Sequence, residues 1–78
     1  MSKADELFKE LGYKIKYSIN NNELIIIGYY KEDNEISIEQ CSILFLKKAK
    51  MIIFNKIIDM QELKAINEKC KELGWLDE

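Results

Sequence analysis

Three lysines and two adjacent tyrosines are the residues whose types could bind an anionic ligand. Lys47, Lys48 and Lys50 form the most concentrated positive charge, and Tyr29 and Tyr30 supply two aromatic rings. Lysines near a ring could hold a nucleotide phosphate while the ring stacks on the base. The alternatives are a solvated hairpin tip for the lysines and core packing for the tyrosines. The absence of arginine weakens the anion site, because a guanidinium makes the better two-point contact to phosphate.

The other reactive side chains argue against catalysis. There is no histidine, and therefore no imidazole base, no histidine-activated nucleophile and no histidine metal ligand. Cys41 and Cys70 fall on expected apolar stripes, where a thiol behaves as a small hydrophobe with a raised pKa. Asp33 and Glu35 could pair as acid and base, but a solvated turn explains them better. We therefore expect a protein that is not an enzyme and that has no cofactor and no metal site.

The length and charge of the chain fit one small domain, covering residues 1–78. Its residues are 47% hydrophobic, which is typical of a globular fold and too high for disorder. The net charge of −2 argues against a general nucleic-acid binder, which relies on many contacts from cations to phosphates. No signal segment and no apolar run of about 18 residues is present, so we expect a cytoplasmic protein with no membrane partner and two reduced thiols.

Both ends of a C-terminal helix are encoded in residues 58–75. Asp59 can cap the first turn, and Glu62, three residues later, can reach back to the N–H of the cap residue. Gly74 can adopt the left-handed conformation that closes the last turn, with Trp75 folding back on the helix. We expect the inner side of this helix to carry four apolar residues: Leu63, Ile66, Cys70 and Leu73.

A shorter helix is expected at the N-terminus. Ser2 is its cap, with Asp5 three residues later, and Gly12 ends it before Tyr13. Its apolar residues recur at the spacing of one helical stripe, Ala4, Leu7, Phe8 and Leu11. The endings 9–13 and 71–75 have the same pattern, Lys-Glu-Leu-Gly-aromatic, which we interpret as the same way of stopping a helix twice.

The segment between the helices predicts four strands. Residues 13–19 alternate apolar and polar, and residues 24–30 are nearly continuously apolar, with Gly28 as a bulge or a point of close approach. Residues 36–46 contain a third strand, with a bend expected near Gln40, and a fourth begins at 51–54 and runs towards residue 58. Three asparagines at 20–22 and the lysine-rich 47–50 mark turns. Short connections favour an antiparallel meander, so the expected fold is α+β in the order α-β-β-β-β-α.

Three of the four strands are apolar on both faces, which a sheet covered on one side does not require. Two short helices cannot easily cover both faces. Either the helices divide between the faces, or the uncovered face binds another molecule. We favour the second alternative, and with it a homo-oligomer, because a small core gains most from association.

The two predicted helices, residues 2–13 (SKADELFKELGY) and 60–75 (MQELKAINEKCKELGW), resemble small uncharacterised proteins encoded by phages and prophages of low-GC Gram-positive bacteria. The resemblance covers about a third of the chain and assigns no binding residues. It implies a phage accessory gene, in keeping with the abundance of Ile, Lys and Asn. Such proteins often antagonise host defence. The implied functions are therefore binding of a host protein, as anti-CRISPR proteins do, sequestration of a nucleotide signal, or a structural role in the phage particle.

Overall fold

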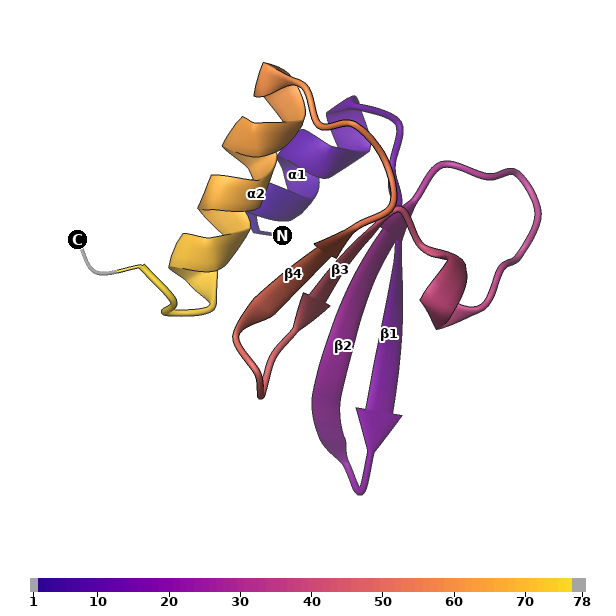
Figure 1. The fold of residues 1–78 in the computed structure, drawn as a ribbon, viewed down its shortest axis with the longest axis vertical. Coiled ribbons are helices and arrows are strands. Elements are labelled where there is room, and N and C mark those ends of the chain that lie inside the picture. Colours follow the sequence, from indigo (N-terminus) through magenta and orange to yellow (C-terminus); the bar gives the residue numbers. More distant parts are fainter. Residues whose placement is uncertain (1, 77–78) are drawn as a thin grey trace.

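The computed structural model describes residues 2–76, which form one antiparallel sheet and two α-helices (Figure 1). The strands pair in chain order, β1-β2-β3-β4, as a meander. This confirms the expected α+β fold. The elements are α1 (Lys3–Glu10), β1 (Lys14–Asn20), β2 (Glu23–Tyr30), a short 3₁₀ helix η1 (Ile38–Gln40), β3 (Ile43–Leu46), β4 (Met51–Phe54) and α2 (Met60–Glu72).

The predicted caps are present at the start of both helices. The Ser2 hydroxyl accepts a hydrogen bond from the Asp5 N–H at 3.0 Å. In α2 the Asp59 carboxylate accepts from the Glu62 N–H at 2.8 Å, and the Glu62 carboxylate accepts from the Asp59 N–H at 2.9 Å. Each donor would otherwise have no partner in its helix, so these caps define where the helices begin.

The two helices also end in the same way. Gly12 and Gly74 have φ of +94° and +76°, the left-handed conformation that glycine adopts without strain. After α1 the N–H of Tyr13 donates to the Phe8 carbonyl at 2.9 Å. After α2 the N–H of Trp75 donates to the Cys70 carbonyl, also at 2.9 Å and across the same number of residues. Each aromatic ring is thereby turned back towards the core.

The third strand is shorter than the segment expected to contain it. It begins only at Ile43, and the expected bend near Gln40 is the helix η1. The Ser37 N–H donates to the Gln40 side-chain oxygen at 2.9 Å, and the Gln40 N–H donates to the Ser37 carbonyl at 3.0 Å. This local pairing curls the backbone and takes residues 36–38 out of the sheet.

Both helices pack on the same face of the sheet, which we call the inner face. Phe8 of α1 stacks on Tyr29 of β2, with ring centroids 3.8 Å apart, and Phe45 of β3 meets both rings edge-on. From α2, Ile66 and Cys70 join this core. Leu63 was expected beside them but is 39% exposed, because Glu62 and Lys69 take places on the buried side of α2.

Candidate functional site

The face of the sheet away from the helices, here called the outer face, is apolar over β2, β3 and β4. Directly paired residues of antiparallel strands point to the same side. Ile26, Leu46 and Met51 form one such row across the three strands, and Leu44 and Ile53 belong to the next. On β1 the row positions are polar, Lys16 and Ser18. The apolar surface therefore lies towards the β4 side of the sheet.

A loop covers only part of the outer face. Residues 31–42, which include η1, lie on the side of the strands opposite the helices (Figure 1). They pack over Gly28, where a Cβ would stand 2.6 Å from Cys41 Sγ and 3.0 Å from Ile38 Cδ1. Only glycine admits this approach, which confirms the close contact expected at Gly28. Met51 and Ile53 remain 60% and 41% exposed.

The boundary between the loop and the bare strands is an open groove of about 290 Å³. Its floor and walls are the aliphatic side chains of Ile26, Ile38, Leu44, Leu46 and Ile53. Polar groups enter its lining only from Glu39 and Asn55. We call this the outer groove. An apolar hollow with a few polar groups at its margin is the usual form of a binding site.

The structure separates the lysines and tyrosines that the sequence suggested as one anion site. Lys47, Lys48 and Lys50 form the β3–β4 turn, next to the beginning of β2, where Lys48 pairs with Glu23 at 2.9 Å. The tyrosines lie at the other end of β2, beside the beginning of β3. They are not brought together around one ligand.

The two tyrosines also point to opposite faces. Tyr29 is fully buried on the inner face, and its hydroxyl donates to Asp5 at 2.8 Å. Burial and the neighbouring Asp5 carboxylate raise the pKa of Tyr29. Tyr30 is half-buried on the outer face, with the Lys14 ammonium 5.7 Å from its ring centroid. Of the predicted site residues, Tyr30 and the three lysines therefore flank the outer face at its two ends, and Tyr29 belongs to the core.

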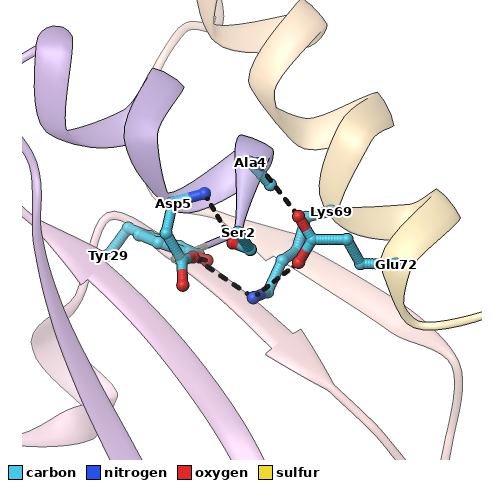
Figure 2. A network of polar contacts seen from close by, with 6 residues as sticks. All are labelled: Ser2, Ala4, Asp5, Tyr29, Lys69 and Glu72. Carbon is cyan, nitrogen blue, oxygen red and sulfur yellow. Dashed lines mark hydrogen bonds and ion pairs between the residues drawn. The ribbon is translucent and has the colours of Figure 1, made fainter.

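A buried polar network joins the two helices to β2 and was not foreseen from the sequence (Figure 2). Lys69 Nζ lies 3.2 Å from Asp5 Oδ1 and 3.5 Å from Glu72 Oε1. The other Glu72 oxygen accepts a hydrogen bond from the Ala4 N–H at 2.9 Å. Burial alone would raise the pKa of Asp5, but the Tyr29 hydroxyl and the Lys69 charge outweigh it, so that the pKa is lowered.

A second buried network surrounds Glu62 at the start of α2. Its carboxylate accepts from the Tyr13 hydroxyl and the Lys56 ammonium as well as from the Asp59 N–H. Burial opposes ionisation of Glu62, but these three donors lower its pKa from 4.5 to about 2. Burial and the adjacent carboxylate raise the pKa of Tyr13.

Both networks are closed rather than open to a ligand. Within residues 2–76, every buried side-chain nitrogen or oxygen has a hydrogen-bond partner. In each network an ammonium lies beside carboxylate oxygens, Lys69 between Asp5 and Glu72 and Lys56 beside Glu62, so both networks hold the helices on the sheet. A larger groove of about 400 Å³ between α1 and β1 takes Asp5 and Tyr13 in its lining, and both are already committed to these networks.

The two thiols are buried and unpaired. Burial raises the pKa of Cys41 and of Cys70, which lowers the fraction of reactive thiolate. Cys41 packs against Gly28 and Cys70 against the aromatic core. Both serve as small apolar side chains, in line with the expectation from the sequence.

Comparison with protein-family models, curated proteins and solved structures finds no match for this chain. Neither of the two helices described between residues 2 and 76 has the length and apolar character to cross a membrane.

Proposed function

We propose that this chain is a non-catalytic binding protein of phage or prophage origin that occupies a host protein, in the manner of anti-CRISPR proteins or other antagonists of host defence. It acts in the host cytoplasm and assembles with itself. The phage origin rests on the resemblance of its two helices, and the binding role rests on the outer groove. One observation carries the binding role: both helices cover the inner face, and the outer face keeps an apolar surface that the 31–42 loop covers only in part.

The chemistry of the groove defines the partner. Aliphatic side chains such as Ile26 and Leu46 bind apolar groups and exclude water from them. The adjoining turn carries Lys47, Lys48 and Lys50, of which only Lys48 has an acidic partner among the contacts of the described residues. We therefore expect the host protein to present two or three apolar side chains beside acidic ones. The lysines then steer association, and the groove supplies affinity.

The geometry supports this role better than sequestration of a nucleotide. A nucleotide site would need aromatic rings and lysines around one cavity. Here Tyr29 is inside the core, and Tyr30 lies at the far end of the outer face from the lysine turn. Calorimetry with a panel of cyclic nucleotides tests that alternative directly, since only a nucleotide-binding protein gives heat. A structural phage component would instead be found in purified virions.

The binding role is tested by affinity capture from host lysate with a pair of matched variants. Ile26→Lys places a charge in the groove, and Ile19→Lys makes the same change at a residue that is 66% exposed and outside the groove. Far-ultraviolet circular dichroism checks that both variants fold. We expect one host protein to be retained by the wild type and by Ile19→Lys, and to be lost with Ile26→Lys. Equal capture by all three proteins, or by none, would overturn the proposal.

A further inference from the structure

The two edges of the sheet differ in their protection against pairing with another strand. The β1 edge carries Lys14 and Lys16, and its register shifts between Ser18 and Ile19. Charges and bulges of this kind discourage edge-to-edge association. The β4 edge, Met51–Phe54, has the sequence Met-Ile-Ile-Phe, with no charge, no proline and no bulge. It is the unprotected edge of the molecule.

The hydrogen bonds of β4 show which backbone groups face outwards. The Asn55 N–H donates to the Ser42 carbonyl at 2.8 Å, so residue 55 faces β3. Facing and non-facing residues alternate along an antiparallel strand, and Ile53 and Met51 therefore face β3 as well. The N–H and C=O groups of Ile52 and Phe54 point to the free edge. Ile52 and Phe54 together therefore present four backbone groups, two N–H and two C=O, that β3 does not pair.

From this pattern we infer that two copies of the chain pair through β4 to form a homodimer, which gives a structure to the self-association in the proposed function. A twofold axis through Ile53 places Ile52 of each copy opposite Phe54 of the other. All four outward groups of each strand are then paired, and the axis keeps the outer faces of both copies on the same side. The result is one eight-stranded sheet. A twofold axis through residue 52 or residue 54 would instead require the backbone groups of Lys50 or Lys56 to take part in the pairing.

The charges at the ends of this pairing are compatible with it. Lys50 of one copy comes opposite Lys56 of the other, where two free ammonium groups would repel. Lys56 is already ion-paired with the buried Glu62. The centre of the pairing, from Met51 to Asn55, is free of charge on both copies.

Most of the exposed apolar side chains lie in the segment that begins with this edge strand. Of the nine large hydrophobic side chains that are exposed in the described part of the chain, six lie between positions 51 and 63: Met51, Ile53, Phe54, Ile57, Met60 and Leu63. Their exposed fractions, 39% to 91%, amount to on the order of 600 Å² per copy at roughly 170 Å² for a fully exposed side chain. Complete coverage of all six in two copies would bury about 1,200 Å², but Met51 and Ile53 lie on the outer face, so strand pairing buries less than this. The interface is therefore small, and we expect a dimer that dissociates on dilution.

The start of α2 adds to the same edge. The Glu72 side chain contacts α1. Leu63 precedes Glu72 by nine residues, which is two and a half helical turns. Leu63 therefore lies on the side of α2 that faces away from α1. In Figure 1, α2 and β4 lie towards the same side of the molecule. Leu63, which was expected inside the core, therefore faces the side where a second copy would dock.

The experiment combines sedimentation equilibrium with hydrogen exchange of the wild-type chain. We expect a monomer–dimer equilibrium in the micromolar range. At high concentration the amides of Ile52 and Phe54 should become protected from exchange, and on dilution they should exchange as free amides. A dimer formed through the outer faces would leave these two amides unprotected, and that result, or a monomer at all concentrations, would overturn the inference.

Cross-linking gives an independent test of the register. In Ile53→Cys the two new thiols meet across the axis, at a Cα separation of about 4.5 Å that suits a disulfide. With oxidised glutathione as oxidant we expect a covalent dimer for Ile53→Cys and none for the wild type. We also expect none for Ile19→Cys, on the protected edge, although Ile19 is more exposed than Ile53, 66% against 41%. A monomeric chain that still captures a host protein would refute the dimer and leave the binding role intact. A dimer that captures nothing would do the reverse.

Discussion

Replacement of Glu62 by glutamine, a change of one atom, should lower the stability of the folded chain by several times the usual effect of a surface substitution. The carboxylate accepts three hydrogen bonds, from the Asp59 N–H, the Tyr13 hydroxyl and the Lys56 ammonium. Glutamine keeps one oxygen for the cap at Asp59. Its amide group, however, brings two donors to a place that already holds the donors of Tyr13 and Lys56. One buried group is then left without a partner.

The size of the effect follows from the pKa of Glu62. The group titrates at 4.5 in an unfolded chain and at about 2 in the folded protein. At about 1.4 kcal/mol per unit, the ionised carboxylate contributes on the order of 3 kcal/mol to folding at neutral pH. The Lys56 side chain is 32% exposed, so that water screens part of its charge. We expect Glu62→Gln to reduce the free energy of unfolding by about 2–3 kcal/mol at pH 7.

The stabilisation by Glu62 should decrease as the pH falls. The folded pKa of Glu62 lies below the unfolded value, so its contribution is complete above about pH 5 and is lost as the pH falls towards 2. Roughly half is gone at pH 3. The variant should therefore differ from the wild type at pH 7 and approach it at low pH. Asp5, whose pKa is also lowered, still gives the variant a smaller dependence of the same sign.

Urea unfolding followed by circular dichroism at pH 7, 4 and 2.5 measures these differences. Glu35→Gln, at an exposed loop position, is the matched control and should change the free energy of unfolding by less than about 0.5 kcal/mol. A loss below about 0.5 kcal/mol for Glu62→Gln at pH 7 would refute the role assigned to the buried carboxylate. So would a loss that is the same at every pH.

Three further predictions concern the interior. Lys69→Met should lower the free energy of unfolding by about 3 kcal/mol, because it removes the cation that Asp5 and Glu72 share. Lys64→Met, at an exposed position of the same helix, should be near neutral in the same urea assay. Similar losses for both variants would contradict this. Gly28→Ala should lower the melting temperature because its Cβ meets Cys41 Sγ, and adding Cys41→Ala should recover part of the loss; no recovery would mean that another contact is limiting. Cys41 and Cys70 should react with Ellman's reagent only after denaturation, and fast reaction of the folded protein would show that they are accessible.

The helix ends were predictable because capping is local. Asp59 and Glu62 are three residues apart, and their reciprocal hydrogen bonds need no other part of the chain. The asparagine turn was predictable for the same reason, since Asn21 and Asn22 adopt positive φ within a two-residue hairpin. The meander followed from such short connections.

The buried charges were not predictable, because they depend on residues distant in the sequence. Glu62 was predicted to cap α2, but its other carboxylate oxygen accepts a hydrogen bond from the Tyr13 hydroxyl, 49 residues away in the sequence. Lys69 lies next to the apolar stripe of α2, and this position in the sequence could have indicated that its side chain is buried. The separation of the anion-site residues, in contrast, was predictable from the meander. Successive turns of an antiparallel meander lie at alternate ends of the sheet, so the 47–50 turn lies at the end where β2 begins and Tyr30 at the other end.

The first and last helices are tied to each other by contacts that span nearly the entire chain. The Ala4 N–H reaches Glu72 over 68 residues, and Asp5 reaches Lys69 over 64. During synthesis α1 is made first but has no counter-charge until the final turns of α2 emerge, so the N-terminal segment must wait for the C-terminal one. A chain that stops before Lys69 would lose the anchor of its opposite end. Nascent or truncated forms should therefore be recognised by proteases at the N-terminus, far from the missing residues.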